Sequence, residues 1–130
     1  MLEAVMCLAL NIYFEARDQN IDGQLMVAEV TMNRVADTSF PDTVCEVVWQ
    51  PGAFSWTDDG KSDRPKDLKA FAQAILLAND VLNGTAPLLG TDATFYHEKS
   101  VNPYWTTSVV EVGMVGDHVF YKKPLRIAAN

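Results

Sequence analysis

The sequence predicts an α+β fold that is mainly helical, with a helical lobe first and a small β-hairpin element last. Apolar residues recur at helical spacing in residues 3–17, 24–35 and 65–83. Alternating β-branched and aromatic residues come only afterwards, in SVVEVGMVGDHVFYK over residues 108–122. Helices grouped before strands are typical of α+β domains. The length of 130 residues predicts a single domain over residues 1–130.

The first two helices are expected to be largely buried. Residues 3–17 are apolar around nearly the whole helical circumference, which is typical of a core helix. Residues 24–35, QLMVAEVTMNRV, are also apolar on most sides, with Glu29 and Asn33 as a polar pair one turn apart. A polar loop containing Gly23 is expected to separate the two helices.

Two further helices follow. Residues 41–49 predict a short helix, and residues 65–83 predict a longer amphipathic one. Between them lies a loop, QPGAFSWTDDGKSDRP, which is rich in turn residues but carries two aromatic side chains. The candidate end signals of the longer helix are Ser62 or Asp63 as N-cap, Pro65 in the first turn, and Gly84 at the C-terminus.

The β element is expected in the last third of the chain. Residues 93–98, ATFYHE, predict a short strand. Residues 108–122 predict a β-hairpin that turns at Gly116 and Asp117, because a two-residue turn with glycine suits a hairpin.

The acidic charge excludes some classes of partner. The net charge is −7 and the pI is about 4.6, so no nucleic-acid partner and no adhesion to anionic lipid is expected. No apolar run approaches the roughly 18 residues of a membrane span, so no membrane insertion is expected. The charge instead favours a partner that is small, neutral or recognised by shape. The chain is expected to be a monomer.

The two cysteines, Cys7 and Cys45, both lie in apolar segments. Free cysteine is often buried, which favours two reduced thiols in the core. A disulfide between them remains the alternative, since connectivity cannot be deduced from sequence.

The N-terminal stretch MLEAVMCLAL carries Glu3 and no Lys or Arg, so it predicts no signal peptide. A protein made in the cytoplasm would then need another protein to let it reach the outside. A phage-type lysis enzyme and a piece of a longer secreted enzyme both fit this pattern.

Glu15 is a carboxylate at the end of the apolar first helix, in ALNIYFEAR. Burial disfavours the charged form of a carboxylate and raises its pKa. A glutamic acid with a raised pKa can donate a proton at neutral pH, as cleavage of a glycosidic bond requires. In the structural alternative, Glu15 closes the helix end by pairing with Arg17 or Arg34 or by reaching a loop amide.

Several motifs occur in the order and with the spacing of a known family: LALNIYFEAR, GQLMVAEVTMNRV, FPDTVCEVVWQPGAFSWTDDG, TFYH, VNPYW and VGDHVFYK. On these motifs the chain resembles the cell-wall hydrolase family of spore cortex-lytic enzymes (SleB-type catalytic domain), over nearly its whole length. The resemblance implies a peptidoglycan-cleaving catalytic domain with a lysozyme-like helical lobe and active site.

The resemblance also implies a mechanism. In this family the Glu of the Y-x-E-A-R motif is the catalytic acid, and that role carries over to Glu15. Its best-known members resemble lytic transglycosylases, which use one Glu twice. It protonates the glycosidic oxygen, and its carboxylate then takes the proton of the muramic acid C6 hydroxyl to give a 1,6-anhydro product. No cofactor is expected.

Substrate-binding residues are expected where aromatic and polar side chains share a loop, since a glycan groove needs aromatic faces and hydrogen-bonding edges. Trp49, at the end of an apolar helix, is expected in the core instead. The histidines match no zinc signature, so no metal is expected. The candidates for glycan binding are Gln50, Phe54, Ser55, Trp56, His97, Asn102, Trp105 and His118.

Three other functions remain open. A hydrolytic muramidase or glucosaminidase would need a second carboxylate. A non-catalytic glycan-binding module would keep the aromatic residues and not need Glu15. A metal-dependent amidase would cut the peptide stem instead. The second-carboxylate candidates are Glu29, Asp58, Asp59 and Glu98, and Glu29 is expected to pair with Asn33 or Arg34.

Overall fold

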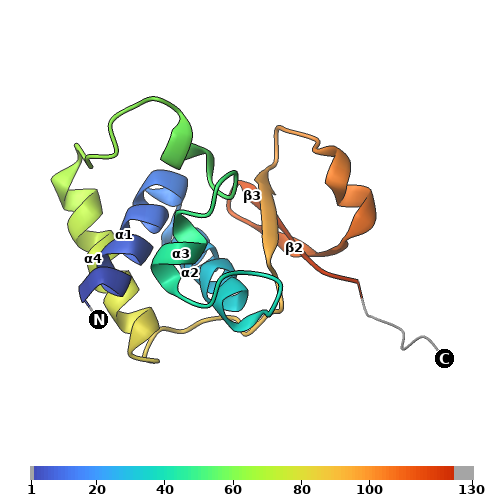
Figure 1. Ribbon diagram of the computed structural model, residues 1–130, viewed down its shortest axis with the longest axis horizontal. Helices are drawn as coiled ribbons and strands as arrows, with labels where there is room; N and C mark the ends of the chain where they lie inside the picture. The colour runs from blue at the N-terminus through green and yellow to red at the C-terminus, as the bar shows by residue number, and fades with distance from the viewer. Residues whose placement is uncertain (1, 125–130) are drawn as a thin grey trace.

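The computed structural model describes residues 2–124, and it confirms the mainly helical α+β fold. The helices form one lobe, and the sheet lies beside it (Figure 1). The elements are α1 (Leu2–Ala16), α2 (Ile21–Ala36), α3 (Val44–Val48), the 3₁₀ helix η1 (Ser55–Asp58), α4 (Leu68–Leu82), β1 (Phe95–Glu98), the 3₁₀ helix η2 (Tyr104–Ser108), β2 (Val110–Val115) and β3 (His118–Lys122).

The helix α1 is the centre of the lobe, since α2, α3 and α4 all pack against it. Leu8, Ala9, Ile12 and Ala16 are fully buried. This arrangement explains why its sequence is apolar on nearly every side. Within residues 2–124, no helix has the length and apolar character needed to cross a bilayer.

Three helices begin at other positions than the sequence predicts. The helix α2 begins at Ile21 because the Asn20 side chain accepts a hydrogen bond from the Gly23 amide at 3.0 Å, which places Gly23 in the first turn and not in a loop. The helix α3 begins at Val44, after its N-cap Thr43. The helix α4 begins at Leu68, because Asp67 and not Ser62 or Asp63 accepts from the amide of the third helical residue.

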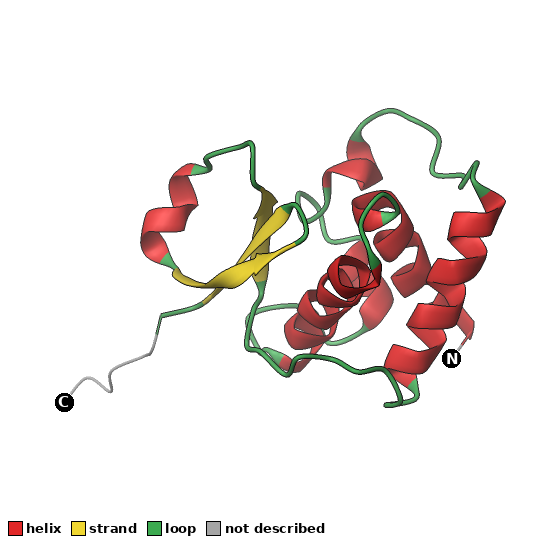
Figure 2. Ribbon diagram, turned by 180° about the vertical axis from the view of Figure 1, so that it is seen from behind, coloured by secondary structure: helices red, strands yellow, loops and turns green. Residues whose placement is uncertain are grey.

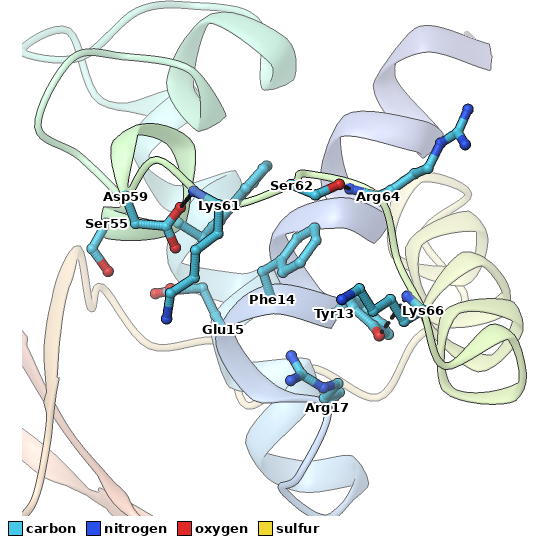
Figure 3. Close-up of a pocket in the computed structure, with 11 residues that line it drawn as sticks. Tyr13, Phe14, Glu15, Arg17, Ser55, Asp59, Lys61, Ser62, Arg64 and Lys66 are labelled. Carbon is cyan, nitrogen blue, oxygen red and sulfur yellow. Dashed lines mark hydrogen bonds between the residues drawn. The ribbon is translucent and has the colours of Figure 1, made fainter.

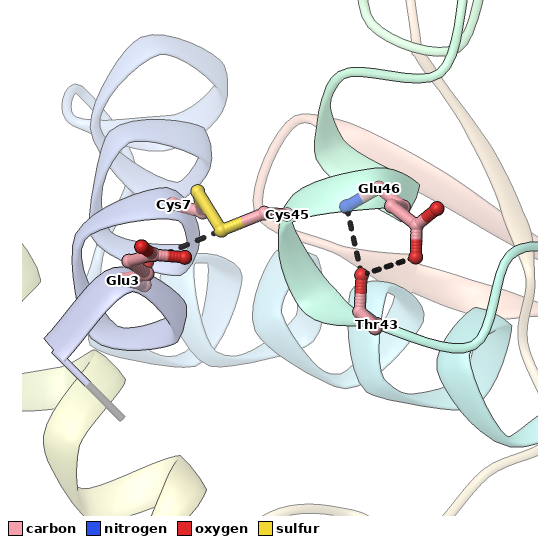
Figure 4. Close-up of a disulfide and its surroundings, with 5 residues drawn as sticks. All are labelled: Glu3, Cys7, Thr43, Cys45 and Glu46. Carbon is pink, nitrogen blue, oxygen red and sulfur yellow. Dashed lines mark hydrogen bonds between the residues drawn. A yellow bond between two sulfur atoms is a disulfide. The ribbon is translucent and has the colours of Figure 1, made fainter.

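A disulfide joins Cys7 in α1 to Cys45 in α3, so the prediction of two reduced, buried thiols is wrong (Figure 4). Both residues are half-buried at the contact between the helices, and their Cα atoms lie 5.3 Å apart. That separation suits a disulfide. Each cysteine has apolar neighbours in sequence because it belongs to a helix that packs in the lobe. Its own side chain lies at the half-buried edge of that helix and not in the core.

The three strands form one antiparallel sheet in the order β1-β3-β2 (Figure 2). The predicted turn is confirmed, since Val115 pairs with His118 and leaves Gly116 and Asp117 as the loop. Gly116 has a φ of 58°, as the first central position of a type II′ turn requires. On β3, Phe120 is fully buried against Met26 and Val30 of α2, and this cluster fixes the sheet to the lobe.

The hairpin turn is also bonded to the loop that follows α1. The Gln19 side chain accepts from the Asp117 amide at 2.9 Å, and its Nε2 donates to Asp117 Oδ2 at 3.0 Å. A Cβ added to Gly116 would lie 2.4 Å from Gln19 Oε1. Gly116 therefore serves both the turn and this close approach.

Candidate active site

Glu15 lies in the last turn of α1, facing the first strand of the sheet. The Tyr96 hydroxyl, on β1, donates a hydrogen bond to Glu15 Oε1. The two residues are 81 positions apart in sequence, so docking of the sheet on the lobe is what brings them together.

Burial raises the pKa of the Glu15 carboxyl above its usual range, and the Tyr96 hydrogen bond and the positive charge of Arg34 oppose that rise only in part. Burial and the neighbouring Glu15 also raise the pKa of the Tyr96 hydroxyl well above its usual value. Tyr96 therefore stays protonated and acts as a donor at neutral pH. Glu15 combines a favoured neutral form with a fixed orientation, as a general acid needs.

Arg34 supplies the buried positive charge of the site. It lies on α2 and is 8% exposed. Its Nε donates to the Thr94 carbonyl oxygen at 2.8 Å, and its guanidinium lies 5.0 Å from the centres of the Phe40 and Phe54 rings. Burial lowers the pKa of Arg34 from that of a free guanidinium, and the charge of Glu15 opposes that change.

The predicted pairing of Glu15 with Arg17 or Arg34 is wrong. The ion pairs formed within residues 2–124 are Lys99–Asp117 and Lys123–Asp37. Glu15 therefore pairs directly with neither Arg17 nor Arg34. Arg34 acts on it through the electrostatic field, and the direct partner is a neutral phenol.

Two cavities adjoin the pair formed by Glu15 and Tyr96. Glu15 lines a cavity of about 440 Å³ between the end of α1 and the loop after η1 (Figure 3). Tyr96 lines a second cavity of about 510 Å³, together with Arg34, Trp105 and the loop at Gly52. The hydrogen bond between Tyr96 and Glu15 therefore links the lining of one cavity to that of the other. A polymer could occupy both, with the bond to be cleaved at Glu15.

Three of the predicted substrate-binding residues line these cavities. Ser55 and Trp56 line the first cavity, and Trp105 lines the second. Trp56 is nevertheless only 5% exposed, because its ring stacks on Phe14 and its indole Nε1 donates to Asn11 Oδ1 at 2.8 Å. It forms a rigid wall of the cavity, with little free surface of its own.

Three others lie behind the cavity walls. Phe54 is 3% exposed and packs against the Arg34 guanidinium. His97 stacks on Tyr121 and its Nε2 is 2.8 Å from the Tyr121 hydroxyl. His118 is 7% exposed and meets the Tyr96 ring edge to face. These positions suit support of Arg34, Trp105 and Tyr96 better than contact with substrate.

Gln50 and Asn102 line neither cavity. Gln50 is half-buried in the turn after α3, and Asn102 is exposed before η2. Trp49, predicted to lie in the core, is 41% exposed, and only one edge of its ring meets Trp56. The prediction that Trp49 lies in the core is therefore wrong.

The other candidate carboxylates differ in their surroundings. Asp59 lines the first cavity and accepts from the Lys61 amide at 2.9 Å. Glu29 accepts from the amides of Gly90 and Thr91, so its predicted pairing with Asn33 or Arg34 is wrong. Glu29 fixes a loop 61 positions away, which no local pattern could reveal. Glu98 accepts a hydrogen bond from the Ser100 hydroxyl. Asp58 is exposed and lines neither cavity.

The sequence does not predict a functional role for two residues of this site, Tyr96 and Arg34. Tyr96 is not among the predicted glycan-binding residues, and Arg34 is expected only as a structural partner of Glu15 or Glu29. An arginine in an apolar helix was the available signal, since a buried charge needs a function or a partner.

Within residues 2–124, no group of three or more His, Cys, Asp and Glu side chains is placed to hold a metal ion.

Residues 18–121 match the family described as Cell Wall Hydrolase. The chain belongs to this family. The matched segment begins just after Glu15, so the role of Glu15 rests on the geometry of the site and on the motif resemblance.

Family members of known description include spore cortex-lytic enzymes. The chain is 31% identical to that of Oceanobacillus iheyensis over 118 residues, which cover 91% of this chain and 41% of the relative. It is 34% identical to that of Halalkalibacterium halodurans over 117 residues, covering 89% and 34%. The chain thus spans well under half the length of these relatives.

Solved structures of the same family share the fold. The catalytic domain of the Bacillus cereus SleB protein superposes with a TM-score of 0.73 at 30% identity, covering 94% of this chain and 91% of that one. The catalytic domain of SleB from Bacillus anthracis, described as a germination-specific lytic transglycosylase, gives 0.73 at 29% identity, covering 94% and 96%. The predicted family and fold class are confirmed.

Proposed function

We propose that this chain cleaves the glycan strands of peptidoglycan as a lytic transglycosylase, with Glu15 as acid and then as base. One observation carries the proposal: a carboxyl group with a raised pKa lines one cavity and accepts a hydrogen bond from Tyr96, which lines a second cavity. The description of the Bacillus anthracis domain as a lytic transglycosylase supports the reaction class.

The first step is a proton transfer from Glu15 to the glycosidic oxygen. The bond between this oxygen and C1 of muramic acid breaks, and the electron pair stays on the leaving oxygen. Burial favours this step because it raises the pKa of Glu15 and so increases the fraction of the proton-bearing form. Tyr96 bonds only one carboxyl oxygen, which leaves the other for the transfer.

The second step closes the sugar ring. The Glu15 carboxylate removes the proton of the muramic acid C6 hydroxyl while that oxygen bonds to C1. The 1,6-anhydro product leaves, and Glu15 is again protonated without a water molecule being consumed. The Tyr96 hydroxyl and the Arg34 charge stabilise the carboxylate that exists between the two steps.

Replacing Tyr96 with phenylalanine should lower kcat/KM by roughly 10- to 100-fold, because a hydrogen bond to a charged group contributes about 1.5–3 kcal/mol. The same bond lowers the pKa of Glu15, so its loss should raise that pKa further. The fall of kcat/KM with rising pH should then occur at a higher pH than in the wild type. A pH profile of kcat/KM for Tyr96→Phe measures both effects.

Tyr104→Phe is the matched control, since Tyr104 is almost fully exposed and lines neither cavity. It should leave the pH profile unchanged. An unchanged alkaline limb in Tyr96→Phe would show that Tyr96 does not control the ionisation of Glu15.

The specific alternative is hydrolysis with Asp59 as the second carboxylate, because Asp59 lines the same cavity as Glu15. A transglycosylase does not need it, so we expect Asp59→Asn to change kcat/KM by less than about 5-fold and to leave the product anhydro. A hydrolase should lose roughly 100-fold or more. Asp58→Asn is the control, since Asp58 is adjacent but lies outside both cavities.

The reaction itself is tested by mass spectrometry of fragments released from purified peptidoglycan by the wild type and by Glu15→Gln. Anhydro-muropeptides from the wild type alone support the proposal. Reducing-end fragments from the wild type alone would indicate a hydrolase. Release by both proteins would show that Glu15 is structural, and release by neither would exclude glycan cleavage.

We further propose that the chain is made in the cytoplasm and acts on the wall as a monomer, with a phage-type lysis role as one setting. The Cys7–Cys45 disulfide supports action in an oxidising compartment. Thiol trapping would show whether Cys7 and Cys45 are reduced or disulfide-bonded in protein from intact cells and in protein from the medium. A disulfide-bonded form confined to the cytoplasm would contradict this location.

A further inference from the structure

The cavity beside Glu15 has a local charge opposite to that of the whole chain. The net charge is −7, and Lys and Arg together number ten. Four of these ten, Arg17, Lys61, Arg64 and Lys66, line this one cavity (Figure 3). Its acidic lining residues are Glu15 and Asp59. The wall is therefore positive whether Glu15 is protonated or not, on a molecule that is otherwise acidic.

The loop that carries three of these cations is fixed to the lobe. The backbone amides of Lys66 and Asp67 donate to the Tyr13 hydroxyl at 3.2 and 3.0 Å. At the other end, the Lys61 amide donates to Asp59 Oδ1 at 2.9 Å. The donors of these hydrogen bonds are backbone amides, so the charged ends of the Lys61 and Lys66 side chains remain free. The end of the loop at Lys66 is thus held by α1, the same helix that carries Glu15 and precedes Arg17.

The four charges are also available to a ligand. The ion pairs within residues 2–124 involve Lys99 and Lys123, and none of the four cavity cations. The Arg17 guanidinium lies 4.9 Å from the centre of the Tyr13 ring, a contact that orients it without neutralising it. A cleft with unpaired charges of one sign concentrates ligands of the opposite sign.

The sugar rings of a glycan strand are neutral, so they give no reason for such a wall. The anionic groups nearest to the cleaved bond are the carboxylates of the peptide stem, which hangs from muramic acid itself. Lys and Arg side chains bind carboxylates by charge-assisted hydrogen bonds. A muramic acid placed with its C1 at Glu15 would bring its stem close to the adjoining cavity wall.

We infer that this cavity binds the free carboxylates of the peptide stem, so that the enzyme prefers glycan strands bearing acidic stems. The inference rests on the proposed cleavage of glycan strands and adds the substrate class to it. It also replaces the expectation of a neutral partner, which the net charge alone had suggested. Electrostatic recognition is local here, and the surrounding acidic surface repels anions elsewhere.

The test compares soluble uncross-linked peptidoglycan strands in two forms, one with free stem carboxylates and one with these carboxylates converted to amides. For the wild type, we expect kcat/KM to be about 3- to 10-fold higher on the free-carboxylate strands, since exposed charge pairs contribute modestly. This ratio should fall toward 1 at about 1 M salt, where the screening length is only about 3 Å.

Two double variants with the same change of charge separate local from global effects. Lys61→Gln/Lys66→Gln removes cavity cations and should bring the ratio close to 1. Lys69→Gln/Lys122→Gln removes cations that line neither cavity, and should keep the wild-type ratio. Lys61, Lys66 and Lys69 are exposed and Lys122 is half-buried, and a thermal melt of each double variant checks that it folds as the wild type does. Arg64→Gln repeats the test with a single exposed residue.

The outcomes distinguish the two proposals. Equal cleavage of both strand forms by the wild type, or an unchanged ratio in Lys61→Gln/Lys66→Gln, would overturn the inference and leave glycan cleavage intact. An equal loss of the ratio in both double variants would show an effect of overall charge, and would also overturn it. No cleavage of either strand form by the wild type would instead contradict the proposed function.

Discussion

Replacing Glu15 with glutamine should reduce glycan-strand cleavage by at least about 10²- to 10⁴-fold, the usual contribution of general acid–base catalysis. Glutamine keeps the size of the side chain and can still accept a hydrogen bond from Tyr96. It cannot give up a proton to the glycosidic oxygen. Because the proposed mechanism uses Glu15 in both steps, no other group should restore the activity.

The same change should not destabilise the fold at neutral pH. Burial raises the pKa of folded Glu15 above its value of 4.5 in the unfolded chain. Between these two pKa values the folded state binds more protons, so stability falls as pH rises through that window. Above the window the ionised carboxylate carries a burial cost that glutamine lacks. Glu15→Gln should therefore unfold at the same or a higher temperature than the wild type at pH 7.

Fragment release and thermal unfolding of the same preparations measure these two effects. Glu111→Gln is the matched control, since Glu111 is exposed on β2 and lines neither cavity. It should keep full activity. Loss of activity together with a lowered melting temperature in Glu15→Gln would indicate a structural role and contradict the assignment.

Removing the Cys7–Cys45 disulfide should lower the free energy of unfolding by about 4 kcal/mol. The bond closes a loop with a sequence separation of 38, and the chain-entropy relation for a loop of this length gives about 4 kcal/mol. Small domains have a total stability of about 5–15 kcal/mol. Loss of the disulfide should therefore leave the chain only marginally folded, or unfolded at physiological temperature.

Urea unfolding of Cys7→Ala/Cys45→Ala, compared with the oxidised wild type, measures this difference. The reduced wild type should match the double variant, and a reductant should have no effect on the variant itself. A difference below about 1 kcal/mol would show that packing of α1 against α3 suffices without the bond.

Features that depend on local sequence were predictable. The all-round apolar character of α1 predicted its central position, and the glycine at position 116 predicted the hairpin turn. The start of α4 was less certain because Ser62, Asp63 and Asp67 are all suitable caps. The fold selects Asp67, since the Tyr13 hydroxyl binds the backbone at 66 and 67 and fixes the chain just before the helix.

Features that depend on contacts distant in sequence were not predictable. Trp56 sits among polar neighbours in the sequence, yet Asn11 on another helix accepts its indole N–H and allows its burial. Glu29 has suitable partners one turn away, but its carboxylate binds a loop from the far end of α4. The sequence identifies the catalytic candidate Glu15, whereas its partner Tyr96 is not among the predicted site residues, because it lies 81 positions away.

The bond between Glu15 and Tyr96 has a consequence for partly unfolded forms of the molecule. Proteins open in cooperative units at a lower free energy than global unfolding. An opening that separates the sheet from the helical lobe would expose Glu15 to water and leave α1 intact. The carboxyl would then lose the burial that raises its pKa. The pKa of this single side chain would thus report whether the two parts of the chain are docked, since it should fall on undocking while the helices remain folded.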